Sequence, residues 1–220
     1  MKKTFSHPAG CRLTSGISEK EWNRLMPCLN AVEHDVKAGG VIFHEGDPAD
    51  RLGIVVSGRV AITRDRLDGT RVVIEQIGPG DSFGASYVYA GAPKMSVAIR
   101  AVEPTKVIIL EAERIPMMCG KACPAHSRFI RNTLTVISIR NFQVKQKLRI
   151  VSQRTTRGKL MLFLHIRAKR AGSNEFDIPY NRQQLADYLY VDRCALSTEI
   201  SKLKARKIID CRKNHFKLLK

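Results

Sequence analysis

The sequence predicts an α+β fold with an N-terminal antiparallel β-roll or jelly roll, one long helix and a C-terminal winged helix-turn-helix. Three observations predict it. Short β-type runs punctuated by glycine fill residues 32–113, and apolar residues recur at helical spacing over residues 130–151. Two short amphipathic runs and a basic hairpin follow in residues 181–220. We expect three parts, residues 1–122, 123–151 and 152–220.

Size and composition set the frame for this division. With 220 residues and 44% hydrophobic content, the chain can bury two modest cores. The first residues are basic but no apolar run follows them, which predicts neither a signal peptide nor a membrane span. We therefore expect a cytoplasmic protein without a membrane partner, whose six cysteines are thiols.

The N-terminal part begins with a short helix, predicted over residues 16–30. Ser18 is its N-cap, and Glu21 closes a capping box three residues later. Asp68-Gly69 is typical of a tight hairpin turn between two strands. The strand candidates are residues 41–43, 52–56, 60–63, 72–77 and 107–110. Many short strands at this spacing favour an antiparallel barrel or a jelly-roll sandwich.

A long helix is predicted next, with Pro124 in its first turn. Its apolar residues alternate at four- and three-residue steps, as in a heptad seam, and we interpret this stripe as the contact surface of a parallel two-stranded coiled coil. The seam residues are Ile130, Leu134, Ile137, Asn141, Val144, Leu148 and Val151. Asn141 would fix the register of a homodimer. The alternative, a core-facing stripe of a monomeric helix, normally has a wider apolar face. Residues 152–157 are the predicted linker.

The last forty residues predict two crossing helices and a hairpin. Residues 182–189 carry one apolar face, and the second helix begins after Asp192, a good N-cap. The second helix turns Leu196, Ile200 and Leu203 inward. Its opposite face is small, polar or cationic, as a helix that enters a major groove requires, and consists of Arg193, Cys194, Ser197, Thr198, Ser201 and Lys202. The alternative is an ordinary helical hairpin with a solvated face.

Charge is strongly segregated along the chain. The net charge is +18, yet residues 1–115 hold 15 basic and 14 acidic residues, whereas residues 116–220 hold 23 and 6. Almost the whole excess thus lies with the helix-turn-helix, as phosphate binding would require. A membrane surface is the competing polyanion, but no stretch resembles a basic amphipathic anchor with bulky aromatics.

These features together resemble the CRP/FNR superfamily of bacterial transcriptional regulators. The resemblance covers the chain from about Gly16 onward, and it is most specific in NRQQLADYLYVDRCALSTEISKLKARKIID (181–210) and GDSFGASYVYAGAPKMSV (80–97). It implies a homodimer that binds a two-fold symmetric operator in double-stranded DNA and contacts RNA polymerase. It also implies that an effector in the N-terminal, cyclic-nucleotide-binding-like domain acts through the long helix.

Carried over by position, the resemblance assigns base contacts to Arg193, Cys194, Ser197 and Thr198. Cys194 stands where the family often has glutamate and Thr198 where it often has arginine, so the best-known operators should not be recognised. Tyr190 occupies a turn position usually given to glycine. Further DNA contacts are expected from Arg182, Gln183, Lys202, Lys213 and His215.

The resemblance also marks an effector pocket. In relatives that bind cyclic nucleotides, a glutamate after a glycine holds the ribose and an Arg-Ser pair holds the phosphate. Here Gly84 precedes Ala85, and the pair is Met95-Ser96. A buried phosphate needs a charged or multi-donor partner, so cyclic AMP is not the expected effector. The pocket residues are Gly84, Ala85, Ser86, Met95, Ser96 and Val97.

Three alternative functions are considered, and the first two stay open. Cys119 and Cys123 would share a helical face if the long helix began early, which suits a redox, iron–sulfur or haem sensor; their other interpretation is as ordinary thiols, with no metal site. A constitutive nucleic-acid binder with a vestigial sensor is the second alternative. An enzyme is the third, and we reject it because the histidines of the β-type region form no His-x-His metal motif and no phosphate loop or nucleophile elbow appears.

Overall fold

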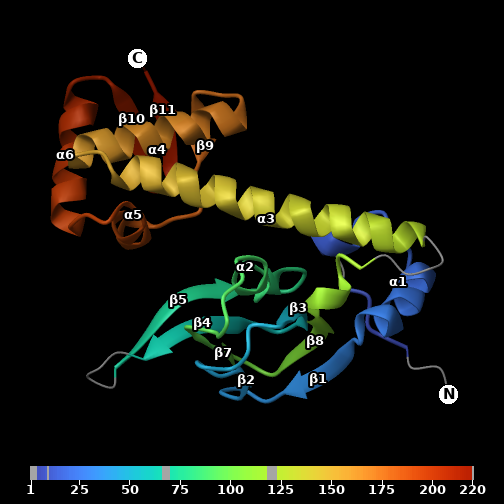
Figure 1. Ribbon diagram of the computed structural model, residues 1–220. Helices are drawn as coiled ribbons and strands as arrows, with labels where there is room; N and C mark the ends of the chain where they lie inside the picture. Colours follow the sequence, from blue (N-terminus) through green and yellow to red (C-terminus); the bar gives the residue numbers. More distant parts are fainter. Residues whose placement is uncertain (1–3, 9, 66–69, 118–122, 220) are drawn as a thin grey trace. The chain divides into compact units, whose positions relative to one another are not determined.

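The computed structural model describes residues 4–8, 10–65, 70–117 and 123–219. Its contacts divide the chain into two compact units, Met1–Ile139 and Arg140–Lys220. The boundary falls inside the longest helix, α3 (Pro124–Val151), drawn in yellow-green to yellow in Figure 1. Among the described residues, no helix is both long and apolar enough to cross a bilayer.

The first unit contains two antiparallel four-stranded sheets. One has the order β1-β8-β3-β6 and the other the order β2-β7-β4-β5. Apolar side chains from both sheets, among them Phe43, Val55 and Ile99, form the core between them. The sequence therefore predicted the β-roll class correctly. The strands are β1 (Val32–Val36), β2 (Val41–Phe43), β3 (Arg51–Ser57), β4 (Val60–Asp65), β5 (Arg71–Ile77), β6 (Ser82–Phe83), β7 (Ala98–Ala101) and β8 (Thr105–Glu111).

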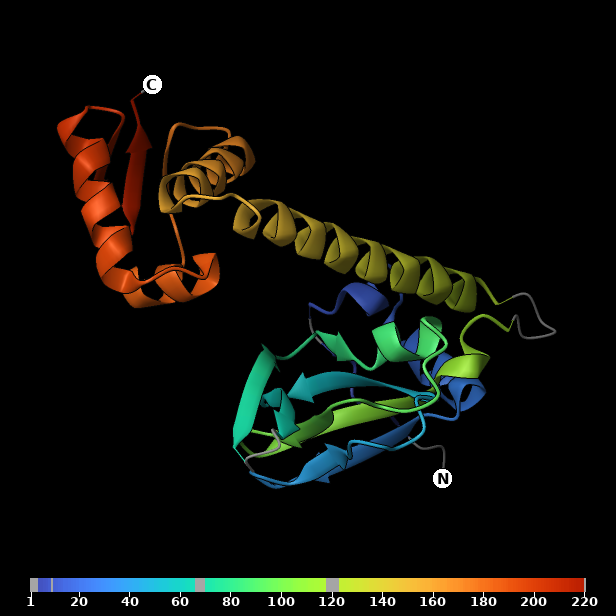
Figure 2. The same cartoon turned by 60° about the vertical axis from the view of Figure 1, so that its left-hand side comes forward.

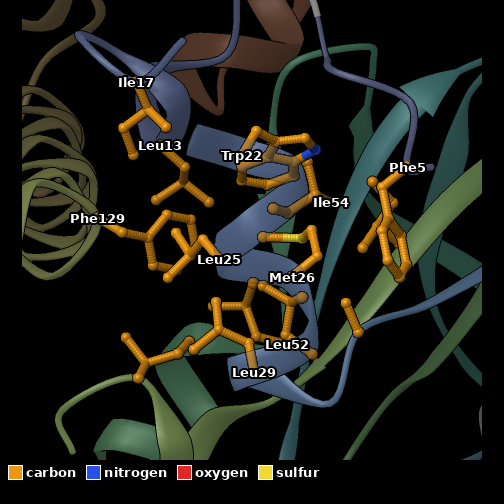
Figure 3. Packing of buried hydrophobic residues seen from close by; sticks show 14 of the residues in the cluster. Phe5, Leu13, Ile17, Trp22, Leu25, Met26, Leu29, Leu52, Ile54 and Phe129 are labelled. Carbon is orange, nitrogen blue, oxygen red and sulfur yellow. The ribbon is translucent and has the colours of Figure 1, made fainter. Parts of the chain in front are cut away.

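A second core covers the outer face of the β1-β8-β3-β6 sheet. Because side chains alternate along a strand, Leu52 and Ile54 of β3 point to this face while Val55 points between the sheets. Figure 3 shows Leu52 and Ile54 beside Trp22, Leu25 and other N-terminal residues. The helices that supply this core are η1 (Arg12–Thr14), α1 (Glu19–Leu25), η2 (Met26–Leu29), α2 (Ala85–Tyr89), η3 (Ala112–Arg114) and the first part of α3.

The first part of α3 is held by this second core. Phe129 is fully buried, and its ring centroid lies 6.0 Å from that of Trp22. The Asn132 amide donates to the carbonyls of Leu13 and Ser15 at 2.9 Å each, and Arg128 pairs with Glu21. The N-terminal segment is thus tied to α3 by both apolar and polar contacts.

The second unit packs three helices against a small sheet of order β10-β11-β9. Figure 2 shows β11 alongside α6, with α5 at the end of α6. Phe163, Leu196 and Phe216 are among its buried residues, and Ile150 near the end of α3 belongs to the same cluster. The elements are α4 (Thr156–Ala171), β9 (Glu175–Asp177), α5 (Arg182–Leu189), α6 (Arg193–Ala205), β10 (Ile209–Arg212) and β11 (His215–Leu218).

The structure corrects several local predictions. The helix expected over 16–30 is α1 followed by the 3-10 turn η2, because Pro27 provides no N–H for a continued helix; its capping box between Ser18 and Glu21 is confirmed. Helix α4 was not predicted, and it begins at Thr156, so the linker is shorter than 152–157. The Thr155 hydroxyl caps it by accepting from Gly158 N at 3.0 Å. The predicted turn at Asp68-Gly69 lies outside the described residues.

Candidate nucleic-acid interface and effector pocket

The helix-turn-helix has the two predicted helices and the predicted N-cap at Asp192, and it has a further capping box at the start of α5. Asn181 and Gln184 form a capping box at the start of α5, and the Asp192 carboxylate accepts from Ala195 N at 2.9 Å at the start of α6. These caps satisfy backbone N–H groups that a helix start leaves free. The inward stripe is at most 4% exposed and consists of Leu185, Ala186, Leu189, Leu196, Ile200 and Leu203.

The outward face of α6 is polar and open to solvent. Arg193, Cys194, Thr198 and Lys202 are exposed, and Ser197 is half-buried. The Ser197 hydroxyl donates to the Arg193 carbonyl at 2.9 Å, so its proton is used within the helix while its oxygen can still accept. The face predicted to contact bases is thus available along the first two turns of α6.

Tyr190, at the turn position that the family usually gives to glycine, ends α5 in the left-handed conformation. Its φ and ψ are 52° and 57°, which costs roughly 1–2 kcal/mol for a residue with a Cβ. Its N–H bonds to the carbonyls of Ala186 and Asp187, and its own carbonyl accepts from Lys159 Nζ at 3.1 Å. Hydrogen bonds on both sides therefore hold the strained turn.

The start of α5 and the turn between β10 and β11, the hairpin that forms the wing, both line one surface hollow. The hollow has a volume of about 540 Å³, and Arg182 and Lys213 both line it together with Asn181 and Asn214. The Arg182 guanidinium lies 5.8 Å from the Phe216 ring centroid, which orients it. Two cations that the sequence assigned to DNA are thus brought together. Gln183 instead donates to Asp187 Oδ1 at 2.8 Å.

His215 on β11 lies between two carboxylates of β9. Its Nε2 is 3.1 Å from Glu175 Oε1, and its Nδ1 is 3.1 Å from Asp177 Oδ1. These hydrogen bonds raise the pKa of His215 above its usual value, and the bond to Glu175 contributes more than the bond to Asp177. Lys217 also pairs with Glu175, at 2.9 Å. The acids that partner His215 are a feature the sequence did not reveal, because they are 38 and 40 residues away.

The residues assigned to the effector pocket divide between two cores. Met95 and Val97 are 2% and 4% exposed and lie between the sheets, where the rings of Phe43 and Phe83 meet edge to face at 5.6 Å. Ala85 belongs instead to the core that holds α3. Gly84 is buried, whereas Ser86 and Ser96 are exposed.

Close packing fills the space beside Met95. A Cβ on Gly53 would lie 2.0 Å from the Phe83 ring, so glycine is needed for that ring to fit. Gly84 has φ 86°, and a Cβ there would lie 2.7 Å from the Arg51 carbonyl oxygen. Ser96 Oγ bonds to the Tyr87 hydroxyl at 3.3 Å, and Lys94 is exposed. Met95 and Val97, the inward residues of the predicted pocket, are therefore apolar and packed within the core between the sheets.

The premise of the cysteine hypothesis is wrong in part. Helix α3 begins at Pro124, one residue after Cys123, so Cys123 lies on no helical face. Cys119 lies outside the described residues. Within the described ranges, no group of three His, Cys, Asp or Glu side chains is placed to hold a metal ion. Cys11 is buried, which raises the pKa of its thiol, and Cys28 and Cys194 are exposed.

The predicted seam of α3 changes character along its length. Ile130 and Ile137 are half-buried against the first unit's second core. Leu134, Val144 and Leu148 are 62%, 66% and 61% exposed, and Asn141 is also exposed. Phe142, which the heptad analysis did not include, is 58% exposed. The later part of α3 thus carries a run of large apolar side chains in contact with solvent.

Two families match the chain, one on each unit. Residues 33–121 match the family described as "Cyclic nucleotide-binding domain", and residues 158–220 match the "Crp-like helix-turn-helix domain". The first match covers the two sheets and α2. The second covers most of α4, both helices of the helix-turn-helix and the wing.

Relatives and solved structures agree with these matches. The chain is 38% identical over 69 residues to a CRP-like cAMP-activated global transcriptional regulator of Mycobacterium tuberculosis, and this stretch covers 31% of each protein. It is 25% identical over 185 residues to the transcriptional activator protein FnrL of Cereibacter sphaeroides, covering 79% of this chain and 70% of that one.

Among solved structures, the catabolite activator protein of Thermus thermophilus matches with a TM-score of 0.53 and 20% identity. The alignment covers 94% of this chain and 93% of that one, and it shows a shared fold. The alignment with the mycobacterial relative thus spans less than a third of that protein's length, whereas the alignment with the Thermus thermophilus structure spans nearly all of that chain.

The two carboxylates beside His215, which we call the carboxylate clamp, are expected to make the stability of the wing, the β10–β11 hairpin, depend on pH. Because the pKa of His215 is raised in the folded chain, the clamp adds stability fully below the ordinary histidine value of about 6.5. This contribution is lost as the pH rises through the raised pKa. We expect the free energy of unfolding of the second unit to fall across that window.

Urea denaturation followed by circular dichroism, at pH values from about 6 to about 9, measures this fall. The His215→Gln variant is the control, because it keeps a hydrogen-bonding side chain that does not titrate. Equal pH dependence in the parent and the variant would show that the clamp contributes nothing.

Proposed function

Since the chain belongs to the CRP/FNR family, we propose that it is a DNA-binding transcriptional regulator that acts as a homodimer under control of its N-terminal β-roll domain. The observation that carries this proposal is the polar, open face of α6 on a capped helix-turn-helix. The charge supports it, because residues 116–220 hold 23 basic and only 6 acidic residues.

Sequence recognition is assigned to the first two turns of α6. Arg193 has a guanidinium that can fork onto guanine O6 and N7, and it lies at the first position of the helix. Cys194, Ser197 and Thr198 are short and allow the helix to approach base edges closely. Arg182, Lys202 and Lys213 contribute phosphate contacts, which give affinity without sequence information.

Dimer formation is assigned to the later part of α3. Leu134, Val144 and Leu148 are apolar and more than 60% exposed, and a second copy of the helix would cover them. A homodimer places two copies of α6 on a two-fold symmetric operator, with half-sites about 34–36 Å apart. RNA polymerase is the further partner that a regulator of this family contacts.

The proposed signal is an effector or a redox change other than cyclic AMP binding. The mycobacterial relative is cAMP-activated, but here Met95 stands at the position of the phosphate-binding arginine and is buried among apolar side chains. A constitutive regulator with a vestigial sensor is the second candidate, favoured by the same close packing between the sheets.

We expect that selection from random duplexes enriches a two-fold symmetric sequence. Changing Arg193→Ala should cost roughly 1–3 kcal/mol of binding free energy at one base pair per half-site, because a bidentate contact is lost. Fluorescence anisotropy on single-substitution operators measures this loss.

Lys202→Ala is the matched control, expected to weaken all duplexes equally and to reduce the salt dependence. Equal affinity of the parent for selected and random duplexes would contradict the proposal. If Arg193→Ala acted like Lys202→Ala, Arg193 would contact phosphate alone.

The seam predicts the effect of Asn141→Leu. An asparagine buried in the seam lowers the stability of a coiled coil, so leucine should strengthen the dimer or change its order. Sedimentation equilibrium measures the dissociation constant. Gln143→Leu, an exposed position off the heptad seam, is the control and should change it little. An unchanged constant in Asn141→Leu would place this residue off the interface.

If cyclic AMP is not the effector, adding it should not change the thermal stability of the protein. A ligand of the folded state at a hundred times its dissociation constant adds about 2.7 kcal/mol to stability. We therefore expect cyclic AMP at about 1 mM to leave the unfolding midpoint of the full chain unchanged. Differential scanning fluorimetry with linear AMP as control tests this, and an upward shift specific to the cyclic form would overturn the exclusion.

A further inference from the structure

Tyr190 is an unexpected residue for its place in the turn between α5 and α6. Its φ of 52° is the conformation that glycine adopts without strain, and tyrosine is unfavourable there. Its side chain is 69% exposed, so burial does not offset the strain. Neither backbone preference nor the hydrophobic effect accounts for a tyrosine at this position.

Contacts with two lysines distinguish this tyrosine from an ordinary exposed ring. Lys147 Nζ, from the last turns of α3, lies 5.1 Å from the Tyr190 ring centroid and 4.9 Å from that of Tyr188. These distances are typical of cation–π interactions. Lys159 Nζ, from the first turn of α4, donates to the Tyr190 carbonyl at 3.1 Å. The turn is thus held by cations from both preceding helices.

The second ring of this contact is fixed by an aromatic cluster. The Tyr188 ring stacks on Tyr180 with centroids 5.1 Å apart, and it lies 5.5 Å from the Phe163 ring. Phe163 is 3% exposed within the core of the second unit. Lys147 therefore reaches a platform that is rigidly part of the helix-turn-helix.

The same stretch of α3 is anchored at two other points. Gln146 Oε1 accepts from Arg170 of α4 at 2.6 Å, and Ile150 is 2% exposed in the second unit's core. Tyr190 lies two residues before Asp192, the N-cap of α6. A rotation of the last turns of α3 would move Lys147 and, through Tyr190, the start of the recognition helix.

We infer that Lys147 and Tyr190 form a latch that fixes the pose of α6 relative to the end of α3, which makes Tyr190 a positioning residue for DNA recognition. The inference rests on the proposed function, because the pose matters only if α6 contacts DNA. The latch itself is a property of the free protein and is testable without DNA.

The first experiment is a double-mutant cycle on the full chain. Lys147→Gln removes the cation, and Tyr190→Leu removes the ring but keeps a Cβ and therefore the backbone strain. Hydrogen exchange of the amides of residues 182–205 measures local opening. We expect each single variant to speed exchange roughly two- to fivefold, and the double variant to add almost nothing to Lys147→Gln, which already removes the contact with Tyr190.

Lys145→Gln is the matched control, an exposed lysine two residues earlier on α3, and it should leave exchange unchanged. Additive effects of Lys147→Gln and Tyr190→Leu would overturn the latch. So would equal effects of Lys147→Gln and Lys145→Gln, since the loss of one positive charge would then explain both.

The second experiment measures affinity for the duplex obtained by selection. We expect Lys147→Gln and Tyr190→Leu each to weaken binding roughly two- to fivefold beyond Lys145→Gln, again without additivity. Coupled exchange with unchanged DNA affinity would overturn the positioning role. If selection enriched no sequence, the proposed function would fail, while the exchange cycle would still decide whether the latch exists.

Discussion

The packing of α3 into two separate cores is the constraint on which the rest of the structure depends. Phe129 near its start is buried with the N-terminal helices, and Ile150 near its end is buried with the helix-turn-helix. A helix anchored in this way must leave its middle to solvent or to another chain. Leu134 and Val144 lie in this stretch and Leu148 follows in the last turn, and these exposed apolar side chains are the ones that a second copy of the chain would cover in the proposed dimer.

Acidic and basic side chains have different roles in the second unit. Its few acids hold structural positions: Asp192 caps α6, Asp210 pairs with Lys204 at 3.0 Å, and Glu175 pairs with Lys217 and His215. By contrast, Arg193 and Lys202 on the outward face of α6 and Lys213 in the turn of the wing are exposed to solvent. A basic surface of this kind raises affinity for phosphate, while the paired acids order the elements that display it.

Local signals made much of this fold predictable from the sequence. The capping residues Ser18 and Asp192 and the heptad stripe of α3 act over a few residues, so pattern alone locates their elements. Helix α4 was missed because its polar and apolar residues lack a clean stripe, and its helicity comes from packing of Leu160 and Phe163 in the core. The partners of His215 and the ring contacts of Lys147 join distant segments, and only tertiary structure brings them together.

The filled space between the sheets limits how the β-roll domain can respond to a signal. A ligand placed beside Met95 would have to displace close-packed side chains, and overpacking a core typically costs about 1–3 kcal/mol. A full switch between two states also needs a ligand that prefers one of them by about 5.5 kcal/mol. Helix α2 offers another route, because Ala85 and Val88 lie in the same core as Phe129. A displacement of α2 would change the core that holds the first part of α3, and through Tyr87 it would also affect the core between the sheets.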